Sequence, residues 1–340
     1  MTQPDRRFER QERFAALGAE GQARLEESRC LLVGCGALGG VIAQELTRAG
    51  VGTLVLVDRD IVEITNLPRQ VLFEDKHATE GTLKVEAALE TLSRIGGPTR
   101  FETHAEHLDA ENIEDLAEGC DLILDGTDNL GTRYLVNDYC VEAGLPWIYG
   151  GVVGSGGLVM PVLPGVGPCL RCVFPEPPPA GALPTCETAG VILPAVAAIA
   201  SLQAGLALRL LASPEGLEPA LVELDVWSAE TRRVRAKRRI GCPCCDEREF
   251  PYLHDPQARP ATILCGRNTV QVRGRQPAPE PRAVAAALEG IAREIRFAGP
   301  ILRFDVEEFR VTLFEDGRAL IEGTDEIERA LAVYDRYIGT

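Results

Sequence analysis

The stretch that decides the fold is Cys30-Leu-Leu-Val-Gly34-Cys-Gly36-Ala-Leu-Gly39, with its continuation Leu54-Val-Leu-Val-Asp58. An apolar run enters a glycine-rich turn, a helical stretch follows, and a second apolar run ends in an acid, which predicts strand, turn, helix and strand. Gly34 permits a tight turn, Gly36 lets backbone N–H groups approach a phosphate, and Gly39 lets the helix lie close to the strand. Asp58 lies where a carboxylate accepts hydrogen bonds from ribose hydroxyls. The unit predicts a nucleotide-binding site, in preference to a glycine turn that binds nothing, without deciding which nucleotide.

The composition places limits on the class of protein. At 340 residues the chain is long enough for a large core and an appended domain. Its formal net charge of −16 argues against a general nucleic-acid partner or an anionic membrane. The N-terminus carries charges where a signal peptide needs an apolar core, so we expect a cytoplasmic protein. The apolar segment Ala189 to Ala212 is interrupted by polar residues and is better interpreted as a buried or interface helix than as a membrane span.

The alternation of elements continues beyond Asp58. We expect a helix over 81–95 with Lys84 in its first turn, strands near 99–103 and 121–125, and helices near 110–118 and 131–143. This order predicts a doubly wound, Rossmann-like α/β fold with a mostly parallel sheet. The glycine turn, Asp58 and Asp128 then share the edge of the sheet where open α/β folds bind ligands.

The remainder of the chain predicts two domains, 1–250 and 251–340. Before the boundary we expect a helical segment over 6–28 with the apolar anchors Phe8, Phe14, Leu17 and Leu25. We also expect strands near 146–149, 157–163 and 221–226, an exposed crossover over 175–186, and a basic run over 232–239. After it we expect a small α+β domain with strands near 261–264 and 269–272, and helices over 281–295 and 325–337. An Asp316-Gly317 turn predicts a hairpin between the two helices.

Two C-x-x-C pairs occur among eleven cysteines, Cys169-Leu-Arg-Cys172 and Cys242-Pro-Cys244-Cys245. Four thiolates from two such pairs form a closed tetrahedral zinc site, so we expect a structural zinc ion held by Cys169, Cys172, Cys242 and Cys245. A redox role is the alternative, but neither pair opens a helix in a thioredoxin-like pattern. Cys244 is able to substitute for one of its neighbours as a ligand.

Cys186 stands apart from these pairs. It follows the proline-rich crossover and precedes a helix, whose N-terminal field favours a thiolate, although an inert loop cysteine fits the same position. We expect the remaining cysteines to be core residues and the four histidines to be ordinary polar residues.

Seven motifs together resemble those of one known family. They are Arg7-Phe-Glu-Arg10, Gly34-x-Gly36-x-x-Gly39, Asp58-x-Asp60, Asn66-Leu-x-Arg69-Gln, Lys84-Val-Glu, Asp125-x-Thr-Asp128-Asn129 and the two C-x-x-C pairs. In this order they resemble the ThiF/MoeB/HesA family, the bacterial relatives of ubiquitin-activating enzymes, over residues 6–245. The tail, around Cys265 and Leu313-Phe-Glu-Asp-Gly-Arg-Ala319, is similar to that of Bacillus-type ThiF proteins.

The resemblance implies an adenylyltransferase that uses ATP and Mg²⁺ to activate the C-terminal glycine carboxylate of a ubiquitin-fold sulfur carrier, ThiS-like or MoaD-like, ending in Gly-Gly. It implies that Arg69 and Lys84 neutralise phosphates, Asn66 positions them, Asp128 holds magnesium and Asp58 binds the ribose. It also implies a homodimer in which Arg10 serves the other subunit's site. Cys186 occupies a position that forms an acyl-disulfide with the carrier in some members, and a persulfide donor is a further implied partner.

Two other functions are compatible with parts of the sequence. The glycine turn alone permits an NAD-dependent oxidoreductase, which leaves Arg69, Lys84 and Asp128 unexplained. A non-catalytic zinc-bound scaffold is disfavoured because no proposed catalytic residue is missing. The basic run over 232–239 is either a solvated edge or a docking patch for an acidic carrier. The pathway, thiazole or molybdopterin formation or tRNA thiolation, stays open, with a modest preference for the thiazole.

Overall fold

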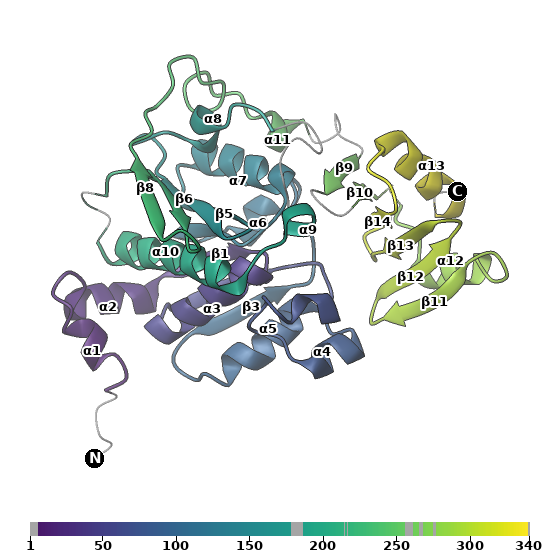
Figure 1. The fold of residues 1–340 in the computed structure, drawn as a ribbon, viewed down its shortest axis with the longest axis horizontal. Helices are drawn as coiled ribbons and strands as arrows, with labels where there is room; N and C mark the ends of the chain where they lie inside the picture. The colour runs from purple at the N-terminus through teal and green to yellow at the C-terminus, as the bar shows by residue number, and fades with distance from the viewer. Residues whose placement is uncertain are drawn as a thin grey trace. The chain divides into compact units, whose positions relative to one another are not determined.

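The computed structural model describes residues 6–177, 186–213, 215, 217–255, 261–264, 268–274 and 277–338 (Figure 1). They fall into two compact units, which are considered separately here. The first comprises Met1–Pro177 and Gly190–His254, and the second comprises Pro178–Ala189 and Asp255–Thr340.

The first unit is built on an eight-stranded sheet of order β3-β2-β1-β4-β5-β6-β7-β8. Strands β3, β2, β1, β4 and β5 pair in parallel, and β6, β7 and β8 add in antiparallel fashion. The expected Rossmann-like, mostly parallel α/β fold is therefore confirmed. The strand bounds are β1 Arg29–Val33, β2 Thr53–Val57, β3 Arg100–His104, β4 Leu122–Asp125, β5 Trp147–Val153, β6 Gly156–Val162, β7 Leu221–Asp225 and β8 Glu230–Val234.

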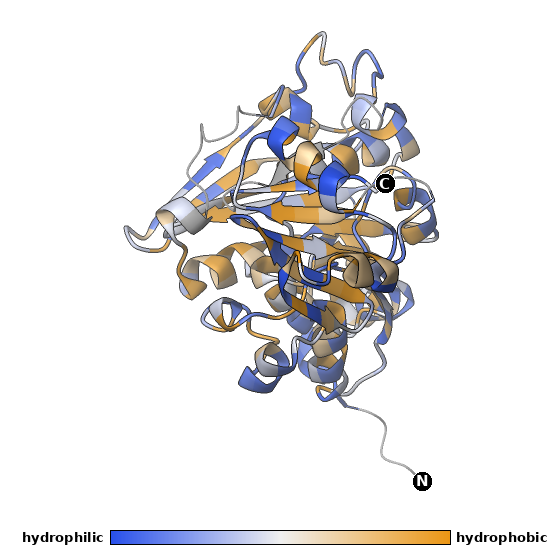
Figure 2. Cartoon of the chain, turned by 90° about the vertical axis from the view of Figure 1, so that its right-hand side faces the viewer, coloured by the Kyte–Doolittle hydropathy of each residue, from blue (hydrophilic) through white to orange (hydrophobic). Residues whose placement is uncertain are grey.

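Helices cover both faces of this sheet, because successive side chains of a buried strand point to opposite faces. Along β1, Leu32 belongs to one buried cluster and Leu31 to another. The first cluster includes α3 Ala37–Ala49, α5 Lys84–Ser93 and α10 Leu193–Ala212, and the second includes α6 Ile113–Leu116, α7 Leu130–Ala143 and α8 Leu170–Val173. Figure 2 shows the strands between these layers coloured mainly as hydrophobic.

Helix α10 is the one helix among the described residues that is long and apolar enough to cross a membrane by length and composition. Half of its most apolar window is buried against the rest of the unit, and its Gln203 donates a hydrogen bond to the Asp125 carbonyl at 2.8 Å. Such burial is typical of a core helix, as its interrupted apolar pattern predicts.

The N-terminal segment forms two helices, α1 Glu9–Glu12 and α2 Gly18–Glu27. Of the apolar anchors expected there, Leu25 is buried, whereas Phe14 is 66% exposed, so its assignment as an anchor is wrong. The remaining helices of the unit are the 3₁₀ turn Ile64–Asn66, α4 Asp75–Glu80 and α11 Pro251–His254.

The described part of the second unit contains a six-stranded antiparallel sheet of order β11-β12-β13-β14-β10-β9, with α12 Pro281–Ala287 and α13 Ile327–Tyr337. The Asp-Gly turn joins β13 to β14, as predicted. The helix expected over 281–295 is wrong in its second half, because Gly290 adopts a φ of +79° and a strand begins at Arg293. The strand bounds are β9 Ala261–Leu264, β10 Thr269–Val272, β11 Arg293–Ala298, β12 Ile301–Val306, β13 Phe309–Leu313 and β14 Ala319–Glu322, and α9 Cys186–Ala189 groups with this unit.

Candidate active site

The carboxyl ends of β1, β2 and β4 bring three loops together at one edge of the sheet. The backbone N–H of Gly34 donates to Val57 O at 2.7 Å, and that of Gly126 donates to Val33 O at 2.8 Å. The loops that follow these strands begin with the glycine turn, Asp58 and the Gly126–Asn129 segment. The predicted convergence of these motifs on one edge is therefore present.

The glycine turn is closely packed against the loop after β4. Gly34 has a φ of +90°, and a Cβ at this position would lie 2.8 Å from Gly126 O. A Cβ at Gly39 would lie 1.8 Å from Gly34 O, so only glycine fits there. At Gly36 a Cβ would meet nothing closer than Gln70 Nε2 at 3.6 Å. Packing within the chain thus explains Gly34 and Gly39, while Gly36 has room for a Cβ but adopts a backbone conformation, φ −75° and ψ −137°, outside the regions that other residues favour.

Asp58 is fixed by the backbone on both sides. Its Oδ2 accepts from Cys35 N at 2.7 Å and its Oδ1 from Asp60 N at 2.8 Å. Each carboxylate oxygen keeps a further lone pair, so this arrangement leaves acceptor capacity for ribose hydroxyls. Burial raises the pKa of Asp58, against the opposing effect of the Lys84 charge.

Lys84 is the first residue of α5, as the sequence predicts, and its side chain is buried. Its Nζ donates to Asp60 Oδ2 at 2.8 Å, and its backbone N–H donates to Asp60 O at 2.9 Å. This acid compensates for a cation at a helix N-terminus. The role of Asp60 was not predicted, because its contact with Lys84 joins two segments that the sequence does not show to be neighbours.

Asn66 and Arg69 lie in the loop between β2 and α4. Asn66 is buried, and its Oδ1 accepts from Glu63 N at 2.9 Å, which caps the 3₁₀ turn. Arg69 is half-buried, and its Nη1 donates to Thr65 O at 2.7 Å. The neighbouring Gln70 is buried, and its Oε1 has no hydrogen-bond partner among the described residues. Gln70 faces the glycine turn, since its Nε2 lies 3.6 Å from where a Cβ of Gly36 would be, whereas Asn66 and Arg69 bond within their own loop.

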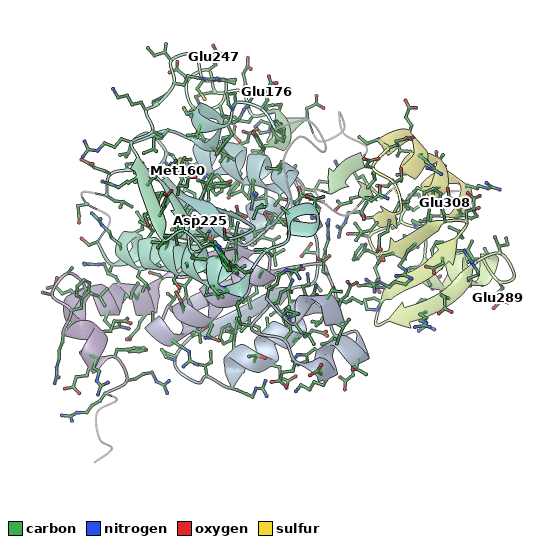
Figure 3. All side chains as sticks on the ribbon, viewed as in Figure 1. Met160, Glu176, Asp225, Glu247, Glu289 and Glu308 are labelled. Carbon is green, nitrogen blue, oxygen red and sulfur yellow. The ribbon has the colours of Figure 1, made fainter. Side chains whose placement is uncertain are left out.

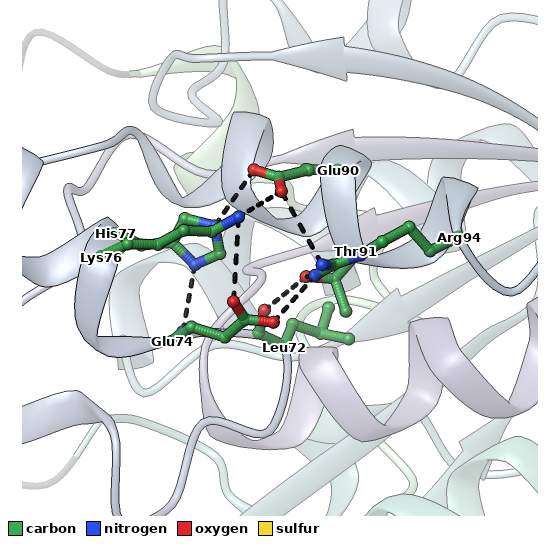
Figure 4. Close-up of polar contacts among 7 residues, drawn as sticks. All are labelled: Leu72, Glu74, Lys76, His77, Glu90, Thr91 and Arg94. Atoms are coloured by element: carbon green, nitrogen blue, oxygen red, sulfur yellow. Dashed lines mark hydrogen bonds and ion pairs between the residues drawn. The ribbon is translucent and has the colours of Figure 1, made fainter.

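A polar network behind this loop joins α4 to α5 (Figure 4). Buried His77 accepts from Glu74 N through Nδ1 at 3.0 Å, and its Nε2 lies 3.2 Å from Glu90 Oε2. Arg94 donates to Glu74 Oε1 at 2.9 Å, and Lys76 pairs with Glu90. The helix that begins with Lys84 and the loop that carries Arg69 are thus connected.

Asp128 is exposed in the loop between β4 and α7. Asp125 Oδ1 accepts from Thr127 N at 2.9 Å and from Thr127 Oγ1 at 2.8 Å, and Asn129 Oδ1 caps α7 by accepting from Thr132 N at 3.2 Å. Buried Arg133 donates through Nε to Asp125 Oδ2 at 2.8 Å. Arg133 was not predicted as a site residue, and its only signal in the sequence is a basic residue in the first turns of a helix that follows an acidic loop.

Arg10 and Cys186 are not part of this convergence. Arg10 is exposed on α1, and the adjacent Gln11 donates to Ala49 O at 2.9 Å, at the end of α3 opposite the glycine turn. Since α3 has 13 residues, this end is about 20 Å from the turn. Cys186 begins α9, but its side chain lies outside the described residues.

The four predicted metal ligands do come together. Among the described residues, the Sγ atoms of Cys169, Cys172, Cys242 and Cys245 all lie within 4.8 Å of one another. Individual Sγ distances are 3.8 Å for 169–172, 3.6 Å for 169–242 and 3.4 Å for 172–245. Tetrahedral zinc with Zn–S bonds of about 2.3 Å requires separations of about 3.8 Å. The donor set therefore fits zinc in a closed site.

Residues of α7 form hydrogen bonds with the segments that carry the cysteine cluster. Asn137 accepts from Leu170 N at 2.8 Å through Oδ1, and its Nδ2 donates to Cys244 Sγ at 3.1 Å. Asp138 accepts from Tyr252 N at 3.1 Å, and burial raises the pKa of its carboxyl to about 6. Cys244 therefore serves as a partner of α7 and is not among the four clustered thiols.

Comparison with known proteins gives a consistent result. A model of the ThiF family matches residues 8–244. The chain is 40% identical over 342 residues to the sulfur carrier protein ThiS adenylyltransferase of Bacillus subtilis, covering 98% of this chain and 99% of that protein. It is 39% identical over 249 residues to the sulfur carrier protein adenylyltransferase of Thermus thermophilus, covering 71% of this chain and 90% of that protein.

Among solved structures, that of E. coli MccB with ATP matches with a TM-score of 0.60. The two chains are 22% identical, and the match covers 71% of this chain and 74% of that one. At this identity the likeness supports the fold alone.

Proposed function

Because the chain belongs to the ThiF family, we propose that it is an ATP-dependent adenylyltransferase that activates the C-terminal glycine carboxylate of a ubiquitin-fold sulfur carrier protein. The observation that carries this proposal is the gathering of Asp58, the Asp60–Lys84 pair and the Asp128 loop around the glycine turn. A relative that aligns over nearly the whole chain is named for the same activity.

The proposed reaction requires the site to bring two anions together. A carboxylate oxygen of the carrier attacks the α-phosphorus of ATP, the bond from that phosphorus to the β-phosphate bridging oxygen breaks, and pyrophosphate leaves. Lys84 and Arg69 supply positive charge beside the phosphates, which lowers the barrier by electrostatic stabilisation. Asp58 accepts from the ribose and thereby fixes the nucleotide for in-line attack. Asn66 contributes to phosphate placement beside the glycine turn.

The proposed magnesium ligand is Asp128. An exposed carboxylate at a strand's carboxyl end supplies the hard oxygen donor that Mg²⁺ prefers. When bound, the ion would neutralise phosphate charge. The loop contacts of Asp125 and Asn129 support this assignment, because they order the backbone on both sides of Asp128.

The four-cysteine cluster is proposed to hold a structural zinc ion. All four donors are thiols, and four such ligands complete the tetrahedron without leaving a coordination position for a substrate. Zinc would join the segment after β6 to the segment after β8, which stabilises the end of the first unit.

The proposed partners follow from the family and from the full-length relative. We assign a ThiS-like carrier ending in Gly-Gly and the thiamine thiazole pathway, since the match to the ThiS adenylyltransferase includes the second unit. A MoaD-like carrier and molybdopterin formation are the alternative. A homodimer with Arg10 in trans, a persulfide donor, an acyl-disulfide at Cys186 and a cytoplasmic location complete the proposal.

An ATP–pyrophosphate exchange assay with purified Gly-Gly carriers tests the function. The expected result is carrier-dependent exchange that falls at least about 100-fold in Asp128→Ala. Asp121→Ala is the matched control, because Asp121 is an exposed acid before β4, at the opposite edge of the sheet, and exchange should be unchanged.

Two outcomes would reject the adenylyltransferase. The first is absence of exchange with every carrier tested, and the second is undiminished exchange in Asp128→Ala. Tighter binding of NAD than of ATP, measured by calorimetry on the same protein, would favour the oxidoreductase. Unchanged function of Arg69→Ala in cells would favour the scaffold.

A further inference from the structure

Arg133 occupies a buried position directly behind the Asp128 loop. It lies one turn into α7, and its guanidinium makes three hydrogen bonds. Nε donates to Asp125 Oδ2 at 2.8 Å, and Nη2 donates to Thr127 O at 2.6 Å and to Gly150 O at 2.8 Å. One side chain thus connects the end of β4, the loop after it and the neighbouring strand β5.

These contacts restrain the loop from two sides. Asp125 Oδ2 accepts a hydrogen bond from Arg133, and Asp125 Oδ1 accepts hydrogen bonds from the backbone N–H and the hydroxyl of Thr127. The Thr127 carbonyl in turn accepts from Arg133. Asp128 follows immediately in the chain, so the direction in which its side chain leaves the backbone depends on these bonds.

The strand on the far side of Arg133 packs closely against α10. A Cβ at Gly150 would lie 2.2 Å from Gln203 Oε1, which shows how closely α10 packs on this residue. Gln203 Nε2 also donates to Asp125 O at 2.8 Å. Arg133 therefore bonds the Asp128 loop to a rigid support formed by β4, β5 and α10.

The charge of Arg133 is retained in this buried position. Burial disfavours the cation, but the Asp125 carboxylate, through its charge and its hydrogen bond, acts together with Tyr149 and Asp128 to hold the pKa of Arg133 above its usual range. The guanidinium also lies 5.2 Å from the centre of the Tyr149 ring. A planar fork reaches a carboxylate and two carbonyls at once, which the single ammonium of a lysine does less well.

We propose that Arg133 is a positioning residue for adenylation, which sets the orientation of Asp128 without itself contacting ATP or the carrier. This inference rests on the proposed function and extends it to a residue outside the family motifs quoted above. A role confined to stability would be served equally by any ion pair, whereas two of these three hydrogen bonds go to backbone carbonyls, one in the loop and one in the strand beside it.

Arg133→Lys tests this role with Arg29→Lys as the matched control. Arg29 also makes three forked bonds, to both oxygens of Glu102 at 2.6 and 2.7 Å and to Glu118 O at 3.1 Å, but it begins β1 at the opposite edge of the sheet. We expect Arg133→Lys to lower kcat of carrier-dependent exchange about 10- to 100-fold, with KM for the carrier changed less than about threefold. Arg29→Lys should leave both values near those of the wild type.

Hydrogen exchange of the backbone amides from Gly126 to Asn129 supplies a readout that does not depend on activity. We expect these amides to exchange at least about tenfold faster in Arg133→Lys and unchanged in Arg29→Lys, at temperatures where both variants are folded. If Arg133→Lys does not fold, Arg133→Gln, which keeps one donor group, replaces it in both measurements.

The outcomes separate this inference from the proposed function. Faster amide hydrogen exchange in the Asp128 loop of Arg133→Lys, together with the loss of kcat, supports the inference. Amide exchange at the wild-type rate, or a wild-type kcat, in the folded variant overturns it. An inactive wild-type protein whose loop nevertheless loosens in Arg133→Lys would reject the adenylyltransferase and keep the loop restraint.

Discussion

Single residues at the glycine turn show which positions are constrained by packing. Gly39 and Gly205 are both helical glycines, yet a Cβ at Gly39 would lie 1.8 Å from Gly34 O, and a Cβ at Gly205 would meet nothing within 4 Å. The same residue type therefore has opposite consequences at the two positions.

We predict that Gly39→Ala lowers the free energy of unfolding by about 1–3 kcal/mol or more, because the backbone carbonyl it meets cannot move away without disturbing the turn. Gly205→Ala is the control and should raise it by up to about 1 kcal/mol, since alanine is the better helix former. Urea denaturation followed by circular dichroism measures both. Equal stability of the two variants would contradict the close packing of α3 on the turn.

Cys120 allows a prediction of pH dependence. Burial raises the pKa of its thiol to about 11, with Arg29 acting in the opposite direction. At pH 8 the thiolate is then about one part in a thousand, against roughly a quarter for a thiol of ordinary pKa. Iodoacetamide labelling of Cys120, followed by peptide mass spectrometry, should still rise about tenfold per pH unit between 8 and 10. Glutathione is the reference thiol, and levelling of the Cys120 rate below pH 9 would disagree with this burial.

For single residues, the sequence identifies the acids and cations that lie at the ends of strands and helices, but it does not identify the residues with which they pair. Asp58, Lys84 and Asp128 follow recognisable local signals, namely the end of an apolar run or the start of a helix. The pairs Asp60–Lys84 and Asp125–Arg133 join segments whose proximity depends on the tertiary fold. The four cysteines of the two C-x-x-C pairs are the exception, since their spacing predicted that the four thiols come together.

Helix α7 is the element that connects the two sites of the first unit. Its first turns carry Arg133 behind the Asp128 loop, and its third turn carries Asn137 and Asp138 beside the cysteine cluster. Nine of its 14 residues are buried, so α7 supports both sites from within the core of the unit.

We predict that Asn137→Ala lowers zinc affinity about 10- to 100-fold, as loss of an outer-shell partner does at other metal sites. The variant leaves Leu170 N unpaired between the first two ligands, which also costs about 1–3 kcal/mol. Competition with a chromophoric chelator measures the affinity. Cys140→Ala, a buried change on the same helix away from the cluster, is the control that should reduce stability without altering zinc affinity. Equal zinc affinities of the two variants would show that Asn137 does not stabilise the zinc site.

The accuracy of the predicted elements depends on how local their signals are. Strands β1, β2 and β4 of the first unit are buried apolar runs that end at a glycine or an acid, and their predicted positions match the structure within a few residues. In the second unit, residues 281–295 have helical composition throughout, yet α12 ends at Ala287 and the chain turns at Gly290, which has a φ of +79°, before β11 begins at Arg293. The antiparallel edge β8 is fully exposed and carries no apolar pattern that would have predicted it.

At the scale of the whole molecule, every described residue assigned to ATP binding or zinc belongs to the first unit. The Thermus relative is covered to 90% by a match that spans 71% of this chain. We therefore predict that a fragment of residues 1–254 folds, binds zinc and keeps carrier-dependent exchange within about threefold of the full chain. Zinc content and the rate of carrier-dependent pyrophosphate exchange measure this.

A fragment of residues 1–239, which lacks Cys242 and Cys245, is the control and should neither hold zinc nor unfold cooperatively. Loss of exchange in a folded, zinc-loaded 1–254 fragment would assign the second unit to adenylation itself.

The position of α1 bears on the assembly of the active enzyme. Arg10 lies about one helix length from its own glycine turn, beyond the reach of its side chain. If it contributes to adenylation, it has to act on the site of a second copy. Mixed dimers of Arg10→Ala and Asp128→Ala then contain one intact site each, composed of Asp128 from one subunit and Arg10 from the other.

We predict that unfolding and refolding an equimolar mixture of these two inactive variants restores about a quarter of the wild-type exchange activity. Half of the dimers formed by random pairing are mixed, and each has one working site of two. A mixture of Arg10→Ala with the double variant Arg10→Ala/Asp128→Ala contains no intact Arg10 and should restore nothing. If Arg10 served its own site, or had no part in the reaction, the first mixture would also gain nothing over its components. The recovered fraction therefore distinguishes a shared site from two independent ones.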